Sequence, residues 1–133
     1  PKIRNLNRFL SDENDTVQQL VQLKNKGFLD LKSRTGFNSL PNYDATDEST
    51  IHRARAYLEI NCAHCHNPKG TAYMTMLDLR YESPMNETGI WLKQAKIIGR
   101  MSVLGKMHMP QKGTTVLHDE GILLIKSYLE SMK

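Results

Sequence analysis

Apolar residues recur at helical spacing in four stretches of the chain, and polar segments that contain glycine and proline separate these stretches. Alternation of apolar and polar residues, which is typical of half-buried strands, is scarce. The pattern therefore predicts an all-α fold with helices over approximately residues 16–26, 51–60, 90–98 and 119–131. Residues 1–10 are polar and are expected to be irregular.

The first predicted helix and the segment after it form a region of their own. Asp15 is the expected N-cap, Gln18 takes the capping-box position three residues later, and Gly27 ends the helix as a C′ residue. Ser, Asn, Thr and Asp dominate residues 33–50, which predicts a loop. We expect residues 1–50 to be an N-terminal extension with one helix and a loop.

The two cysteines are the most informative part of the sequence. They lie in the string Cys62-Ala63-His64-Cys65-His66, which has the CxxCH spacing of covalent haem attachment. In such a site each thiol adds to one vinyl group of haem c, and two intervening residues let one turn present both sulfurs to one porphyrin edge. His66 would ligate the iron through one ring nitrogen, while its other nitrogen needs a hydrogen-bond acceptor, typically a backbone carbonyl.

Three other kinds of site share a cysteine pair at this spacing. A thioredoxin-type redox site would follow a strand in a βαβ pattern, which the sequence lacks. A disulfide between Cys62 and Cys65 would close a very small loop and contribute little stability. A zinc site would need another cysteine pair or closely spaced histidines, and the remaining histidines form no such pair: His52, His64, His108 and His118. Haem attachment is therefore the favoured hypothesis.

The order of these elements resembles a class I mono-haem cytochrome c. An amphipathic helix leads into the CxxCH motif, glycine-rich loops follow, and a Met-Pro dipeptide precedes the last helix. The resemblance implies a cytochrome c-like helical fold around one covalent haem, in which helices 51–60 and 119–131 cross near one haem edge, with Tyr57 and Tyr128 as aromatic contacts. It also implies that Met109, in the Met-Pro dipeptide, is the sixth ligand of the iron.

A longer string around the motif is similar to the C-terminal cytochrome-like module of a family of uncharacterised secreted bacterial proteins. The string covers residues 54–66, and a Leu-Asp-Leu-Arg segment at 77–80 and an Arg-Asn-Leu-Asn segment at 4–7 accompany it. This resemblance makes residues 51–133 the cytochrome c domain and residues 1–50 a family-specific extension.

The late loop offers several candidates for the sixth ligand. Met107 can serve as a core residue, or as the ligand if the loop shifts its register, and His108 would give bis-histidine iron with a lower reduction potential. A vacant sixth site would allow gases or peroxide to bind. Met109 leads because Pro110 restricts the backbone after it and the pair matches the cytochrome pattern.

Three further residues are candidates for contact with the haem. The indole nitrogen of Trp91 can donate to a haem propionate, although an isolated tryptophan is as often a core residue. Arg80 and Arg100 can neutralise propionates, although most arginines are solvated at the surface. Residues 1–50 contain no histidine, cysteine or methionine and are not expected to ligate the iron.

Composition narrows the choice of partners. The 133 residues include 18 lysines and arginines and 14 aspartates and glutamates, which gives a net charge of +4. The basic residues are scattered and aromatic residues make up 7%, which argues against nucleic acid and favours an acidic protein partner. No apolar run approaches the roughly 20 residues of a membrane-spanning helix. The chain begins at Pro1 without a signal peptide, as expected for a mature protein or for a domain fused to an upstream one.

Together these observations predict one-electron transfer between periplasmic or secreted redox partners, by a c-type haem with His66 and Met109 as axial ligands. The chain would be an electron-transfer protein, not an enzyme, or the electron-accepting domain of a larger oxidoreductase. The alternatives are a haem enzyme or a gas or peroxide sensor with a labile distal site, and a zinc-binding interaction module without haem.

Overall fold

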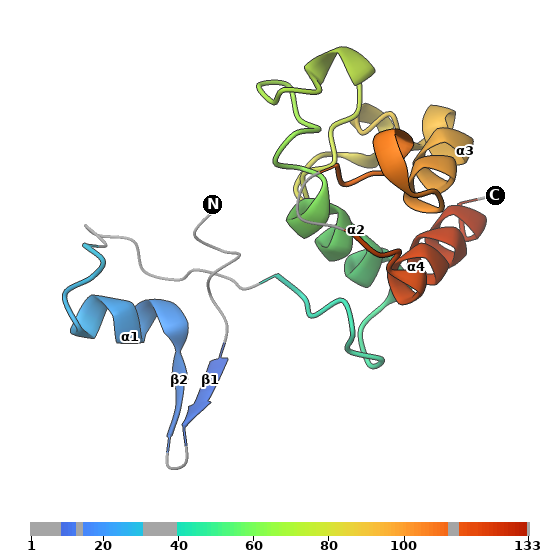
Figure 1. Cartoon of the computed structure of the whole chain (residues 1–133). Helices are drawn as coiled ribbons and strands as arrows, with labels where there is room; N and C mark the ends of the chain where they lie inside the picture. The colour runs from blue at the N-terminus through green and yellow to red at the C-terminus, as the bar shows by residue number, and fades with distance from the viewer. Residues whose placement is uncertain (1–8, 13–14, 31–39, 112–114, 133) are drawn as a thin grey trace. The chain divides into compact units, whose positions relative to one another are not determined.

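The chain forms two compact units, residues 1–40 and residues 41–133. The computed structural model describes residues 9–12, 15–30, 40–111 and 115–132, and Figure 1 traces their elements. Among the residues that it describes, no helix is both long and apolar enough to cross a membrane.

The described part of the first unit is a β-hairpin followed by a short helix. Strand β1 (Phe9–Asp12) pairs antiparallel with β2 (Asp15–Gln18), and α1 spans Gln19–Asn25. The helix ends as predicted at Gly27, which has a φ of +74° and donates its N–H to the Lys24 carbonyl.

The expectation of a helix that starts after Asp15 is wrong, and Phe9 and Leu10, which were expected to be irregular, lie in strand β1. Asp15 lies opposite Asp12 at the turn of the hairpin, and the β-branched Thr16 and Val17 sit in strand β2. Such residues fit a strand better than a helix because their χ1 freedom is restricted. The predicted capping box is therefore part of a strand, and the helix begins at Gln19. Residues 1–8, with the Arg-Asn-Leu-Asn segment, and the predicted loop up to residue 39 lie outside the described residues.

The second unit is built from three helices of equal length joined by loops and single 3₁₀ turns. The helices are α2 (Thr50–Asn61), α3 (Ile90–Met101) and α4 (Asp119–Glu130). The short turns are η2 (Tyr73–Thr75), η3 (Met85–Glu87) and η4 (Gly105–Met107). Its described residues contain no strand, which agrees with the predicted all-α class.

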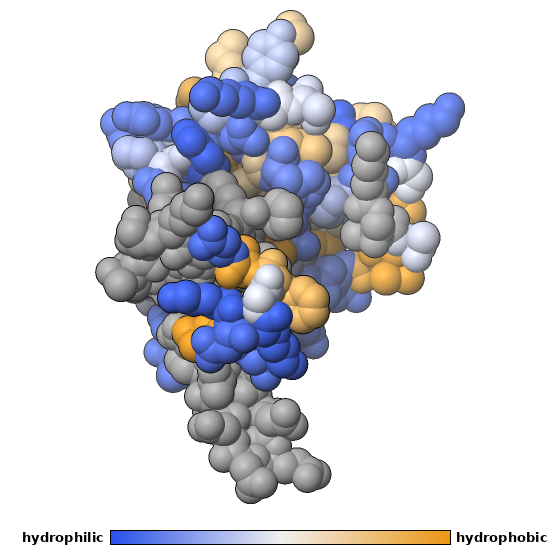
Figure 2. All heavy atoms as spheres, turned by 90° about the vertical axis from the view of Figure 1, so that its left-hand side faces the viewer, coloured by the Kyte–Doolittle hydropathy of each residue, from blue (hydrophilic) through white to orange (hydrophobic). Residues whose placement is uncertain are grey.

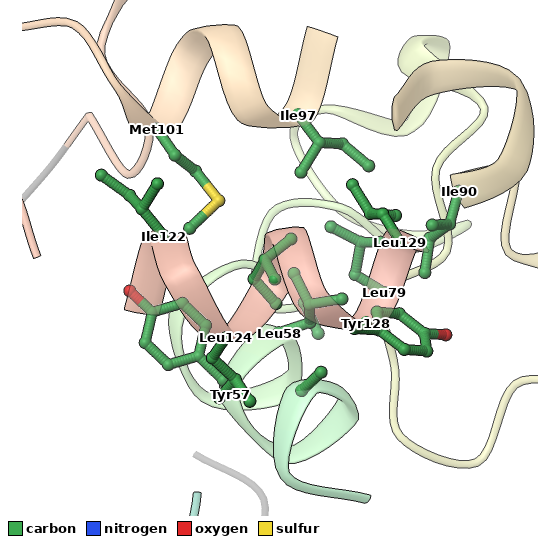
Figure 3. Packing of buried hydrophobic residues seen from close by; sticks show 13 residues of the cluster. Tyr57, Leu58, Leu79, Ile90, Ile97, Met101, Ile122, Leu124, Tyr128 and Leu129 are labelled. Carbon is green, nitrogen blue, oxygen red and sulfur yellow. The ribbon is translucent and has the colours of Figure 1, made fainter. Parts of the chain in front are cut away.

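Helix α4 is the common neighbour of the other two helices. It packs against α2 on one side and against α3 on another (Figure 1). Its buried Ile122 and Leu129 meet apolar side chains from α2 and α3 (Figure 3), and Ile125 is buried in the same cluster. The remaining members of this core are Ala54, Tyr57, Leu58, Ala63, Leu79, Ile90, Ile97, Met101, Leu124 and Tyr128.

One tyrosine determines how closely α2 approaches α4. The ring of Tyr57 stacks on His118 with centroids 5.5 Å apart, and its hydroxyl lies 3.0 Å from His118 Nδ1. A Cβ atom at Gly121 would lie 2.4 Å from Tyr57 Cζ and Oη, so only glycine leaves room for the ring there. Tyr128 is buried in the same core, and its hydroxyl donates to Met85 Sδ at 3.2 Å.

The segment before α2 packs with the helices. Tyr43 contacts Tyr57 edge-on, with ring centroids 5.4 Å apart, and its carbonyl accepts from Arg53 Nε at 2.7 Å. The second unit accordingly begins at Pro41, ahead of the border that was expected after residue 50.

Gly121→Ala is expected to destabilise the protein because the new methyl group would collide with Tyr57. Overpacking of this kind costs about 1–3 kcal/mol, which exceeds the gain in helix propensity. Gly99→Ala in α3 is the matched control, since a Cβ there meets nothing within 4 Å and alanine favours a helix. Urea unfolding should show a loss of stability for Gly121→Ala and a gain for Gly99→Ala. Equal effects would contradict the role of Gly121.

Candidate functional site

The CxxCH motif forms a single tight turn at the end of α2. Cys62 is the C-cap of the helix, and its N–H still bonds the Leu58 carbonyl at 2.9 Å. The N–H groups of Cys65 and His66 then both donate to the Cys62 carbonyl, at 3.1 and 2.9 Å. One turn of backbone thus carries both thiols and the imidazole, on a helix that the core holds rigidly.

The chain after the motif folds back onto the motif and forms hydrogen bonds with it. Ala72 donates its N–H to the Cys65 carbonyl at 3.1 Å. Gly70 lies so close that a Cβ atom there would be 2.0 Å from the same carbonyl oxygen. The Asn67 side chain donates to the Ala63 carbonyl at 2.7 Å. Sequence reasoning missed Gly70, because a single glycine after a turn carries no signal of what it must fit against.

The hydrogen bonds of His66 determine which ring nitrogen carries the proton. Its Nδ1 lies 3.0 Å from the Thr75 hydroxyl oxygen, and that hydroxyl donates its own hydrogen to the Ala72 carbonyl at 2.6 Å. Thr75 can therefore only accept from Nδ1–H. The other ring nitrogen, Nε2, is then left with a lone pair, which is the state that a metal ligand needs. The expected acceptor was a backbone carbonyl, and the structure supplies a hydroxyl.

The surroundings of His66 also keep the imidazole neutral. Burial lowers the pKa of His66, and the nearby His64 and Arg100 lower it further. Arg100 comes from the last turn of α3, far from the motif in sequence. Its effect on His66 indicates that the end of α3 lies near the motif.

The two thiols do not have the character of a thioredoxin-type site. Both cysteines are free. Burial raises the pKa of the Cys62 thiol to about 12, and the neighbouring Cys65 contributes to this rise. Cys62 caps the C-terminal end of α2, where the helix dipole disfavours a thiolate, whereas redox-active thiols have a lowered pKa.

The zinc alternative gains no support from the arrangement of side chains. Within residues 9–12, 15–30, 40–111 and 115–132, no group of three or more His, Cys, Asp or Glu residues is placed to hold a metal ion. A structural zinc site would need four such ligands.

The three candidates for the sixth ligand lie in the loop after α3 and differ in burial and hydrogen bonding. Met109 is half-buried, and its N–H donates to the carbonyl of Arg100 at 3.0 Å. Arg100 is also the residue of α3 that lowers the pKa of His66. His108 is buried, and its Nδ1 lies 2.7 Å from the Val103 carbonyl. Met107 is 57% exposed. The backbone of His108 is extended.

The predicted propionate ligands have different surroundings. Arg80 is already engaged, because its Nε donates to Asp78 Oδ1 at 2.8 Å and its guanidinium forms an ion pair with the same carboxylate. Arg100 donates to the Met107 carbonyl at 3.5 Å and lies near His66. Trp91 lies in the first turn of α3 and is 53% exposed.

Buried charges on α2 position the segment that carries Asp78 and Arg80. Arg55 is 7% exposed, and its Nη2 donates to the carbonyls of Arg80, Tyr81 and Ser83, at 2.7, 3.1 and 2.7 Å. Glu59 accepts from the Tyr81 N–H at 2.7 Å. The same segment reaches the motif, since Leu79 donates its N–H to the His66 carbonyl at 2.9 Å.

The residues around the motif suit an apolar group such as a porphyrin. Large apolar side chains lie exposed in the two segments tied to the site: Tyr73, Met74 and Met76 around η2, and Leu104 and Met107 around η4. Figure 2 shows apolar side chains exposed at the top of the molecule, the end at which Figure 1 draws η2. Free thiols, a neutral imidazole with an available Nε2 and uncovered methionines are together the donor set and lining that a c-type haem requires.

The Asp78–Arg80 pair is expected to make stability pH-dependent. Hydrogen bonds from Arg80 lower the pKa of Asp78 to about 2, so the carboxylate stabilises the fold above about pH 4 and loses this effect as the pH falls towards 2. Because 43% of the Arg80 side chain is exposed, we expect about 1 kcal/mol. Urea unfolding of Asp78→Asn should differ from wild type at pH 6 and converge with it near pH 2.

The exposed Asp47→Asn is the control and should track the wild type throughout. A constant difference between Asp78→Asn and wild type at all pH values would mean that the ion pair does not cause the effect.

Comparisons with known proteins identify no relative: no family model, no curated protein and no solved structure matches the chain. The function must therefore be argued from the site itself.

Proposed function

We propose that the chain attaches one c-type haem through Cys62 and Cys65 and serves as a one-electron carrier, with His66 and Met109 as axial ligands. The observation that carries this proposal is the turn at the end of α2, in which both thiols accompany an imidazole whose Nδ1 is bonded to Thr75. When bound, such a haem supplies an iron that cycles between the ferrous and ferric states.

The protein's contribution is to hold the ligands in one geometry. Cys62 and Cys65 would anchor the porphyrin edge to the end of a helix that the core fixes in place. His66 would bind the iron through Nε2, and Met109, from the loop after α3, would bind it through its sulfur. Two strong ligands that stay the same in both redox states keep the reorganisation on electron transfer small, which is what a carrier requires.

The assignment of Met109 rests on the backbone of the late loop. Met109 is tied to Arg100, whereas the ring of its neighbour His108 is buried and bonded to Val103. Ligation by His108 through Nε2 would leave this hydrogen bond in place, and His108 Nε2 is buried without a hydrogen-bond partner, so His108 is the strongest competitor of Met109. Met107 is largely exposed and has to turn inwards to compete.

The net charge of +4 suits an acidic redox partner, because opposite charges steer the encounter of two proteins. Thioether attachment of this kind takes place outside the bacterial cytoplasm in the cytochromes that the sequence resembles, so we propose a periplasmic or secreted location. Whether the chain acts alone or as the electron-accepting domain of a larger oxidoreductase, the haem attached to this turn would carry the electron.

Covalent attachment is expected to depend on both thiols. The full chain, produced in a host with cytochrome c maturation, should retain haem through denaturing electrophoresis and give a positive haem-peroxidase stain at its own mass. Cys62→Ala combined with Cys65→Ala should abolish the stained band. Haem that extracts completely into acidified organic solvent, or the absence of any Soret band, would contradict the proposal; the latter would favour the zinc module.

The absorption spectrum should identify the sixth ligand. Met109→Ala is expected to remove the sulfur–iron band near the red edge and to introduce high-spin character with new affinity for carbon monoxide. Met107→Ala is the matched control and should leave that band in place. Met109→His should keep the iron low-spin and lower the reduction potential, because a thioether favours ferrous iron more than imidazole does.

The opposite result for the two alanine variants would make Met107 the ligand. If neither variant alters the spectrum, His108 becomes the candidate. High-spin bands in the wild type would favour an enzyme or a gas sensor.

A further inference from the structure

Thr75 lies nine positions after His66 and is the last residue of the short turn η2. Its hydroxyl makes two hydrogen bonds, one with His66 Nδ1 at 3.0 Å and one to the Ala72 carbonyl at 2.6 Å. The Ala72 carbonyl also accepts the Thr75 N–H at 3.0 Å. Both the side chain and the backbone of Thr75 are thus tied to the same carbonyl, which fixes the direction of the hydroxyl oxygen.

Thr75 and Ala72 are attached to the CxxCH motif. Ala72 donates its N–H to the Cys65 carbonyl at 3.1 Å, and Gly70 packs against that carbonyl without room for a side chain. Hydrogen bonds therefore connect His66 to Thr75, Thr75 to Ala72, and Ala72 to Cys65, the residue next to His66. Because these hydrogen bonds join residues close together in sequence, the motif determines the position of the Thr75 oxygen, and distant parts of the chain do not.

We propose that Thr75 is a positioning residue for His66. Its hydroxyl oxygen accepts the Nδ1 proton, holds the ring as the Nδ1–H tautomer, and thereby determines how strongly Nε2 donates electrons to a bound metal. The predicted effect on the reduction potential rests on the proposed function, whereas the predicted tautomer of His66 does not.

The direction of the redox effect follows from the hydrogen bond. An acceptor at Nδ1–H increases the basicity of the imidazole, which stabilises ferric iron more than ferrous iron and lowers the reduction potential. Loss of the acceptor should raise the potential. A purely structural role would give the opposite sign, because a loosened turn admits water, and water stabilises the more highly charged ferric state.

The test compares Thr75→Val and Thr75→Ser in the haem-loaded full chain. Valine has nearly the shape of threonine and lacks the hydroxyl, whereas serine keeps it. We expect a positive shift of the midpoint potential and faster solvent exchange of the His66 Nδ1–H in the ferrous protein for Thr75→Val, and wild-type values for Thr75→Ser. Circular dichroism establishes that each variant is folded. An unchanged or more negative potential in folded Thr75→Val overturns the proposal.

Failure of the proposed function is recognised separately, by the absence of covalent haem in the wild type. In that case the same variants are compared without haem, through the ¹⁵N shifts of the His66 ring at a pH where the ring is neutral. The ratio of Nδ1–H to Nε2–H tautomers should fall roughly fivefold in Thr75→Val, the effect of one ordinary hydrogen bond, and recover in Thr75→Ser. An equal ratio in wild type and Thr75→Val overturns the role of Thr75.

Discussion

The contact between α2 and α4 is the constraint on which the rest of the second unit depends. Tyr57 lies flat against His118 and fills the space left by Gly121, so the two helices meet at one distance and one rotation. Because the CxxCH turn follows directly from α2, the helix packing that fixes α2 also fixes the direction of the thiols and of His66. Helix α3 packs on the other side of α4 and leads into the loop that carries Met109.

Polar groups then complete the site where the apolar core ends. Arg55 and Glu59 are buried on α2 and bind backbone groups of residues 80–83, which is how buried charges avoid the cost of desolvation without a partner. The segment that they hold bonds the His66 carbonyl through Leu79. The chain around His66 is therefore held by hydrogen bonds to backbone groups, and none of these bonds uses the His66 Nε2.

Three exposed methionines lie in η2 and η4 or directly beside them. Met74, Met76 and Met107 are exposed to solvent, and they lie on the segments tied to the CxxCH turn and to α3. In the holoprotein that we propose, a porphyrin would cover such side chains. Stability and cofactor binding would then be linked, since any group that binds the folded state stabilises it.

The sequence by itself determined the helices of the second unit and suggested the chemistry that we propose for the motif, because helical periodicity and the CxxCH spacing are local properties. It failed at Asp15–Gln18, where a capping signal competed with a hairpin partner at Phe9–Asp12 that no local pattern revealed. Only the tertiary structure decided that Thr75 accepts from His66, that Gly70 and Gly121 must be glycines, and that His108 is buried with its Nδ1 at the Val103 carbonyl. These features depend on backbone and side chains brought together from separate segments, and spacing along the chain carries no record of such contacts.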